Sequence, residues 1–238
     1  MGLKRKPPQG NVRNVISMGG NLCSAITNKE GDTVQAESFH ERILTLLFQR
    51  DKSVINYQSQ PETFVFTDRN GKTRRYTPDF IVWRRNGDVE IHEVTLTERQ
   101  EQARIREREL AAGTICRALG WRYIVHTEQT LPQSTEVANL LALYRYRLKA
   151  YAHDVITASA QGYLLQSAKV PLNRCMRYIV QHLNVFEPTV FATLCHLLWH
   201  EELSTDLRTL LIIENTFSPK AMVWLPDREE DNNASTNR

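Results

Sequence analysis

The chain has 238 residues, 41% of them hydrophobic, which is enough for one large folded domain or two small ones. It contains no run of about 18 apolar residues, and no apolar stretch follows its basic N-terminus, so we expect neither a membrane span nor a secretory signal. The net charge of +3 is compatible with a nucleic-acid partner without requiring one.

The first 34 residues are polar and carry an early cluster of basic side chains. The cluster consists of Lys4, Arg5, Lys6 and Arg13. We predict an extended basic arm over residues 1–34 that binds DNA through these side chains. A disordered, solubilising tail is the alternative for the first ten residues.

A helix and a set of strands are predicted next. Residues 36–50 have helical periodicity, and their apolar face is formed by Phe39, Ile43, Leu46 and Leu47. The alternating stretch "ETFVFT" runs into "DRNGK", which is typical of a hairpin. Two further strands, over 77–83 and 89–95, flank the turn "RNGD". These patterns predict one helix followed by three strands.

A charged helix and a buried strand complete this part of the chain. The helix covers residues 98–118, with an apolar stripe at Ile105, Leu110 and Ile115, and it stops at Gly120. The strand is "WRYIVHT", residues 121–127. The order helix, three strands, helix, strand predicts an α/β domain over residues 35–132, in which helices flank a mixed sheet.

The second half of the chain is mainly helical. We predict a connecting helix over 133–150 and further helices over 158–168, 172–183 and 188–203. The stretches "LRTLLII" and "AMVWL" read as two short strands joined by "ENTFSPK". Three helices and a terminal hairpin indicate an α+β winged-helix domain over 151–226, and a helical bundle with a β-finger is the alternative. We expect the polar tail, 227–238, to be disordered.

Two acids stand on adjacent strands in "TPDFIVWRRNGDVEIHEVT". Asp79 precedes the first strand, and Glu93 and Thr95 lie two apart on the second, so their side chains share one face. The carbonyl of Val94, between them, is available near the acids. Such oxygens can hold one or two Mg²⁺ ions, which polarise a phosphate and lower the pKa of an attacking water. An exposed hairpin decorated with acids remains the structural alternative.

Glu41 is the candidate third acid. At 100° per residue it falls beside Leu44 and Phe48, at the edge of the apolar face of its helix, and so is aimed toward the sheet. Ser38 and Glu41 also read as a capping box, which would tie Glu41 to the start of the helix instead. Glu37, one turn earlier, competes for either role.

A helix acid, a long hairpin, "PD" and "E-x-x" together resemble the PD-(D/E)xK restriction-endonuclease-like superfamily. Within it, residues 37–127 resemble TnsA, the endonuclease subunit of heteromeric transposases. The matching pieces are "ESFHERILTLLFQRDKSVINYQSQP", "RRYTPDFIVWRRNGDVEIHEVT" and "GWRYIVHTEQTL". The spacing from Glu41 to "SVINYQSQP" is similar to that of the family and favours Glu41 over Glu37. TnsA proteins also carry a C-terminal winged-helix domain that contacts partner proteins.

The resemblance implies a Mg²⁺-dependent endonuclease, with Mn²⁺ as a substitute, that cuts the non-transferred 5′ strand of double-stranded DNA at transposon ends. It implies a DDE-type transposase and an AAA+ ATPase as partners. Asp79, Glu93 and the Val94 carbonyl would then hold metal, and Glu41 would support them from the helix as a further metal ligand. The four scattered cysteines favour a reducing compartment, here the cytoplasm of a bacterium near its nucleoid.

Thr95 departs from the family, which has a lysine at this position. The lysine helps to hold the attacking water and stabilises the charge of the transition state, and threonine cannot supply that charge. We predict that Arg99 or Arg104 provides the cation, or that metal ions do the work while Thr95 orients water. A catalytically impaired module that links transposase and ATPase, and a stand-alone defence or repair nuclease, are the alternative functions.

Overall fold

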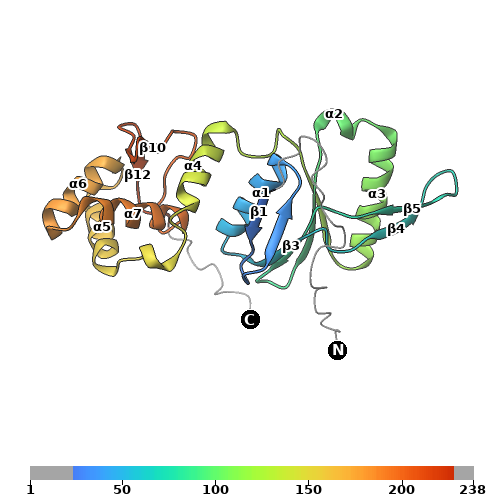
Figure 1. Ribbon diagram of the computed structural model, residues 1–238, viewed down its shortest axis with the longest axis horizontal. Coiled ribbons are helices and arrows are strands. Elements are labelled where there is room, and N and C mark those ends of the chain that lie inside the picture. Colours follow the sequence, from blue (N-terminus) through green and yellow to red (C-terminus); the bar gives the residue numbers. More distant parts are fainter. Residues whose placement is uncertain (1–23, 228–238) are drawn as a thin grey trace, which may run out of the picture. The chain divides into compact units, whose positions relative to one another are not determined.

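The computed structural model describes residues 24–227, and the chain divides into two compact units, Met1–Pro132 and Gln133–Arg238 (Figure 1). The predicted DNA-binding residues Lys4, Arg5, Lys6 and Arg13 lie outside the described residues, as does all of the predicted tail except Asp227.

The first unit contains eight strands and three helices within the described residues. They are β1 (Ser24–Thr27), β2 (Thr33–Ala36), α1 (Phe39–Arg50), β3 (Val54–Ser59), β4 (Phe64–Thr67), β5 (Thr73–Tyr76), β6 (Phe80–Arg84), β7 (Val89–Val94), α2 (Thr97–Gln100), α3 (Ala103–Ala118) and β8 (Arg122–His126). The predicted mixed α/β architecture is confirmed, since a mixed sheet is flanked by helices in a manner consistent with a restriction-endonuclease-like fold.

A four-stranded sheet in the order β3-β6-β7-β8 forms the centre of this unit. β3, β6 and β7 are antiparallel, with Ile81 opposite Ile91, whereas β7 and β8 run parallel, with Glu93 opposite Val125. A parallel pair needs a crossover connection, and α2 and α3 supply it here. This arrangement brings the start of β6 and the end of β7 to the same end of the sheet.

Each face of the sheet is covered by one helix (Figure 1). On one face Phe48 of α1 packs against Phe80 and His92, with ring centroids 5.6 and 4.9 Å apart. On the other face Ile81 and Ile91 form a cluster with residues of α3 and of the β4–β5 hairpin. Alternate side chains of β6 and β7 therefore serve two separate cores.

Two predicted core positions are wrong. Phe39 is 51% exposed because it begins α1, and the buried face of that helix is formed instead by Ile43, Leu44, Thr45, Leu46 and Phe48. Leu110 is 72% exposed, and α3 buries Ala112 and Cys116 in its place. Ile115, a predicted member of the stripe, does pack against this cluster from a half-buried position.

Four strands of the first unit were not anticipated from the sequence, namely β1, β2, β3 and β5. β5 is the hairpin partner of β4, a role that no predicted strand covered. β1 and β2 form an antiparallel hairpin that lies largely within the segment predicted to be an extended arm. The backbone N–H of Gln35 in β2 donates to Ser59 Oγ in β3 at 3.3 Å, which ties the hairpin to the sheet. β3 itself covers "VINYQS", a stretch in which no strand was predicted.

The second unit is mainly helical within the described residues. Its elements are α4 (Ser134–Tyr144), a 3-10 helix (Lys149–Tyr151), α5 (Asp154–Ser167), β9 (Val170–Pro171), α6 (Leu172–Leu183), α7 (Glu187–Trp199), β10 (Ile212–Ile213), β11 (Thr216–Phe217) and β12 (Met222–Val223). α7 is almost entirely buried from Val190 onward and forms the centre of this unit.

The predicted terminal hairpin pairs differently from the expectation. β10 pairs with β11, which lies inside the stretch predicted as a loop, and β12 returns to pair with β9. Glu214 and Asn215 both have positive φ angles, 47° and 64°, which is the backbone of a tight two-residue turn. The chain therefore reverses earlier than the apolar pattern indicated.

Buried polar contacts fix the loops of the second unit. The Asn139 side chain, 1% exposed, donates to the carbonyls of Leu207 and Thr209 and accepts from the N–H of Leu211, each at 2.8 or 2.9 Å.

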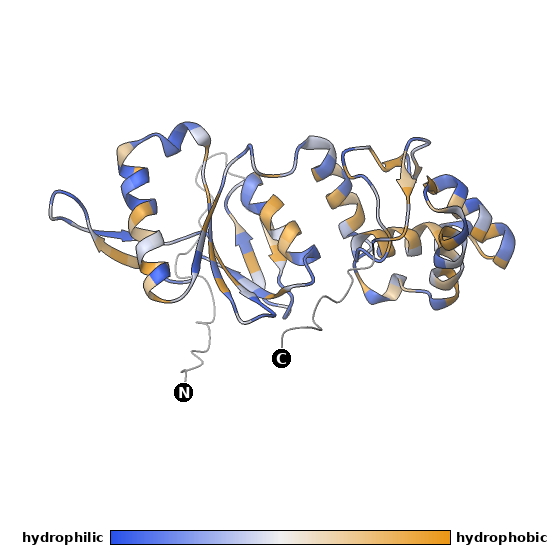
Figure 2. Ribbon diagram, turned by 180° about the vertical axis from the view of Figure 1, so that it is seen from behind, coloured by the Kyte–Doolittle hydropathy of each residue, from blue (hydrophilic) through white to orange (hydrophobic). Residues whose placement is uncertain are grey.

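Figure 2 shows hydrophobic residues gathered on the helices around α7, whereas the first turns of α3 are hydrophilic. No helix within residues 24–227 is long and apolar enough to cross a membrane.

Truncation after Pro132 should leave a cooperatively folded protein. The sheet and both of its helical layers lie within the first unit, so their cores are independent of the second unit. We expect a single thermal transition by circular dichroism and protected amides in β6 and β7 by hydrogen exchange. A truncated chain whose β6 and β7 amides exchange at the rate of an unfolded peptide would contradict this division of the chain.

Candidate active site

Asp79 and Glu93 come together because β6 starts where β7 ends. Pro78 fixes the backbone before Asp79, and the N–H of Val94 donates to Asp79 Oδ2 at 2.7 Å. The N–H and C=O of one strand residue point to the same neighbouring strand, so the Val94 carbonyl also faces the Asp79 side. The structure thus brings together three of the predicted site residues.

The Glu93 carboxylate is 4% exposed and is held at both oxygens. Arg108 Nη2 donates to Oε1 at 2.5 Å, and the Tyr76 hydroxyl donates to Oε2. The Arg108 guanidinium also lies 4.6 Å from the centroid of the Tyr76 ring, and the Tyr123 hydroxyl lies 3.3 Å from that of Tyr76. Glu93 is therefore fixed between a cation and a phenol.

The two acids share an unfavourable electrostatic environment. Burial raises the pKa of Glu93 to about 7, although the Arg108 cation acts in the opposite direction. Burial also raises the pKa of Asp79 well above its usual range, and the negative charges of Glu93 and Glu41 add to this rise. Further positive charge would therefore stabilise the doubly ionised pair.

Glu41 serves as the helix cap that was its alternative role. Its carboxylate accepts from the Ser38 hydroxyl at 2.9 Å and from the N–H of Glu37 at 2.8 Å, while its own N–H donates to Ser38 Oγ. Its charge still contributes to the raised pKa of Asp79, so the cap lies within electrostatic reach of the acids.

Glu37 reaches the site indirectly. It accepts from the Gln60 side chain at 2.6 Å, and the Gln60 N–H donates to the carbonyl of Asp79 at 2.8 Å. Gln60 has a φ of 47°, a left-handed conformation that costs about 1 kcal/mol for a residue with a side chain. Gln60, in this left-handed conformation, helps to hold the backbone of Asp79 in place through that hydrogen bond.

Thr95 is buried and follows Glu93 on the same face of β7. Its N–H donates to the carbonyl of His126 at 2.9 Å, which extends the β7–β8 pairing beyond the last residue of the strand. The position is thus held firmly by the backbone, although its side chain brings no charge.

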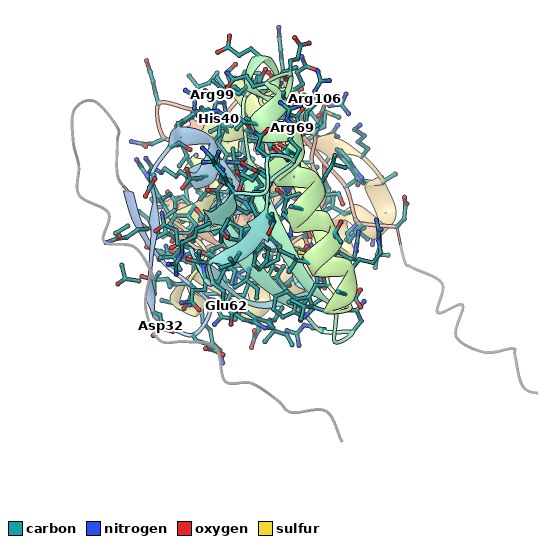
Figure 3. All side chains as sticks on the ribbon, turned by 90° about the vertical axis from the view of Figure 1, so that its right-hand side faces the viewer. Asp32, His40, Glu62, Arg69, Arg99 and Arg106 are labelled. Carbon is teal, nitrogen blue, oxygen red and sulfur yellow. The ribbon has the colours of Figure 1, made fainter. Side chains whose placement is uncertain are left out.

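Arg108 is the cation at the acids, and it was not among the predicted site residues. Arg99 in α2 and Arg104 at the start of α3 are exposed and form no ion pair within residues 24–227. Arg104 and Arg108 are four residues apart on one helix, so they share a face, and this spacing was the available signal. Figure 3 shows Arg99 of α2 and Arg106 of α3 near the upper end of this view of the first unit.

A metal ion would have to use few protein ligands. Within the described residues, no three His, Cys, Asp or Glu side chains are grouped so that they could hold one ion together. Asp79 and Glu93 offer hard carboxylate oxygens, and the Val94 carbonyl faces the same side. Mg²⁺ is commonly bound by one or two carboxylates, substrate phosphates and several waters, so this donor set fits it.

A comparison with known families supports the resemblance. Residues 51–128 match the family described as "TnsA-like endonuclease N terminal". The match covers Asp79, Glu93, Thr95 and Arg108, and it begins after α1, so Glu41 lies outside it. It confirms the predicted resemblance to TnsA-like endonucleases over this segment. No curated protein matches the chain.

The stability of the metal-free protein should report the burial of Glu93. Its pKa is raised in the folded state from 4.5 to about 7, so the folded state binds more protons and loses stability as the pH rises through that range. The Glu93→Gln variant lacks this titration. Between pH 4.5 and 8, its free energy of unfolding relative to the unmodified chain should rise by roughly 3 kcal/mol, measured by urea denaturation in EDTA. A pH-independent difference would contradict the burial of an ionisable Glu93.

Proposed function

We propose that the chain is a Mg²⁺-dependent DNA endonuclease that hydrolyses the non-transferred 5′ strand at transposon ends. The observation that supports this function most strongly is the pairing of Asp79 and Glu93 beside the Arg108 cation, within the segment that matches the TnsA-like family. Two like charges with raised pKa values in a partly enclosed site are typical of a catalytic centre.

In this proposal Asp79, Glu93 and the Val94 carbonyl hold Mg²⁺, and Mn²⁺ can substitute for it. The bound ion would polarise the phosphate and lower the pKa of the attacking water. Asp79 must be ionised for this role, and its hydrogen bond from the Val94 N–H favours that state. Tyr76 and Arg108 orient Glu93, so its carboxylate is already positioned before DNA binds.

Arg108 takes over the electrostatic role of the family's lysine. Its guanidinium lies against the Glu93 carboxylate and reaches the site from α3 rather than from β7. Such a cation stabilises the negative charge that develops on the phosphate, and a positioned charge of this kind is worth roughly 3 kcal/mol. Thr95 remains able to orient water through its hydroxyl, while Glu41 supports the site through its charge and through the start of α1.

The second unit is proposed to be a winged-helix domain that contacts partner proteins. The order of α5, β9, α6 and α7, followed by the β10–β11 hairpin and the return of β12 to β9, supports this assignment. The partners implied by the resemblance are a DDE-type transposase and an AAA+ ATPase. The first unit would then cut DNA while the second one recruits the chain to its complex.

A catalytically impaired assembly module is the second candidate. Both oxygens of Glu93 already have partners in the metal-free protein, and Thr95 replaces the lysine. If Arg108 holds Glu93 too firmly, the site is closed to metal and the chain serves only to join its partners. Cleavage assays with the complete complex separate the two candidates.

Asp79→Asn should abolish cleavage and leave the fold intact. The amide keeps an oxygen for the Val94 N–H but removes the charge of a metal ligand. We expect a loss of at least about a hundredfold in cleavage of end-containing DNA with Mg²⁺, and an unchanged or higher melting temperature because a repelled charge is gone. Asp88→Asn, in the β6–β7 turn, is the matched control and should cut normally. A fully active Asp79→Asn protein would remove the site assignment.

A cation at position 95 should be able to replace the Arg108 cation in part. Arg108→Ala should slow cleavage by on the order of a hundredfold, and Arg108→Lys should retain more activity than Arg108→Ala. Thr95→Lys alone should bring no gain, since two cations would compete for one phosphate, but it should partly restore the Arg108→Ala protein. Arg106→Ala, on the same helix, is the control. Normal cleavage by Arg108→Ala would show that the cation comes from elsewhere.

A further inference from the structure

A groove of about 560 Å³ lies between the β4–β5 hairpin and α3, and its lining includes Arg108, which forms the ion pair with Glu93. Phe66 and Ile105 contribute apolar surface to it, and one carboxylate comes from each wall, Asp68 and Glu107. The remaining charged residues of its lining are all arginines: Arg69, Arg74, Arg75, Arg104 and Arg108. The lining therefore carries five positive charges and two negative charges.

Both carboxylates are already engaged in holding the groove together. Asp68 accepts from the Arg74 side chain at 2.7 Å and from the N–H groups of Asn70 and Lys72, each at 2.9 Å, so it fixes the hairpin turn. Glu107 accepts from the N–H of Arg69, which ties the tip of the hairpin to α3. Glu107 therefore joins the two walls, and Asp68 fixes the shape of the hairpin wall. The two carboxylates leave most of the positive charge uncompensated.

Three of the arginines are available for a ligand. Arg69, Arg75 and Arg104 are exposed, and their side chains make no ion pair or hydrogen bond within residues 24–227. They come from both walls, the hairpin and the helix. An exposed arginine is often only a solvated surface residue, but three of them along the lining of one groove concentrate positive charge at a defined place.

We propose that this groove binds the phosphate backbone of duplex DNA and leads it to the acids. Arg108 belongs both to the groove lining and to the ion pair with Glu93, so a backbone that follows the groove arrives at Asp79 and Glu93. Arginine binds phosphate through bidentate hydrogen bonds, and such contacts position DNA without reading its sequence. This inference rests on the proposed nuclease function and adds the surface that holds its substrate.

The test compares two double variants of the full-length chain that lose equal charge. Arg75→Ala/Arg104→Ala removes one arginine from each wall. Arg85→Ala/Arg117→Ala removes two arginines that do not line the groove. Binding to duplexes of two unrelated sequences is measured by fluorescence anisotropy in EDTA, over a series of salt concentrations. Arg75→Lys/Arg104→Lys keeps the charge and checks that the groove itself is intact.

We expect the groove variant to bind both duplexes on the order of tenfold more weakly, and the slope of log affinity against log salt to fall by about one for each lost phosphate contact. The control should bind normally, and the lysine variant should recover most of the affinity. Equal losses in the groove and control variants, or no loss in either, would overturn the proposal, as would DNA binding too weak to detect in the unmodified chain.

The cleavage assay keeps the two proposals separate. If the groove variant binds DNA normally while Asp79→Asn abolishes cleavage, the groove assignment fails and the nuclease stands. If the groove variant alone loses DNA binding but the unmodified chain never cuts, the groove is supported and the nuclease proposal fails.

Discussion

The ion pair between Glu93 and Arg108 is the interaction on which the candidate site depends. It joins the end of β7 to α3, the crossover helix, and with the Tyr76 hydroxyl it holds a carboxylate that is 4% exposed. A buried charge without such partners would cost several kcal/mol. The same pair places a cation beside Asp79, and it sets the inner end of the arginine-lined groove.

The fold positions this pair through chain topology. Because β6 and β7 are antiparallel, the start of one meets the end of the other, and Asp79 reaches the Val94 N–H. Because β7 and β8 are parallel, a crossover helix must pass over the sheet, and the side chain of Arg108 on α3 reaches Glu93 from that side. In the proposed centre, this cation on the crossover helix takes the role of the lysine that the related family carries on the strand.

The features that could be predicted from the sequence are those that depend on the spacing of neighbouring residues. The "RNGD" turn sets the register of β6 and β7, so the neighbourhood of Asp79 and Glu93 followed from the pattern alone. The position of Arg108 depends on the rotation of α3 about its axis, which Ala112 and Cys116 determine by packing against Ile81 and Ile91. For Glu41 the sequence left open a role as the third acid and a role as the helix cap. The structure shows the cap, because Glu41 and Ser38 exchange the local hydrogen bonds of a capping box. The β10–β11 pairing depends on two positive φ angles at Glu214 and Asn215, which the apolar pattern does not reveal.

The most direct test is an anomalous difference map of crystals grown with Mn²⁺ and a cleavage-resistant phosphorothioate duplex. The proposed centre predicts a Mn²⁺ peak between Asp79 and Glu93, with the backbone phosphate against Arg108. A map in which Mn²⁺ avoids both acids, while Arg108 and Tyr76 still occupy the two oxygens of Glu93, would contradict the nuclease centre and leave the assembly role.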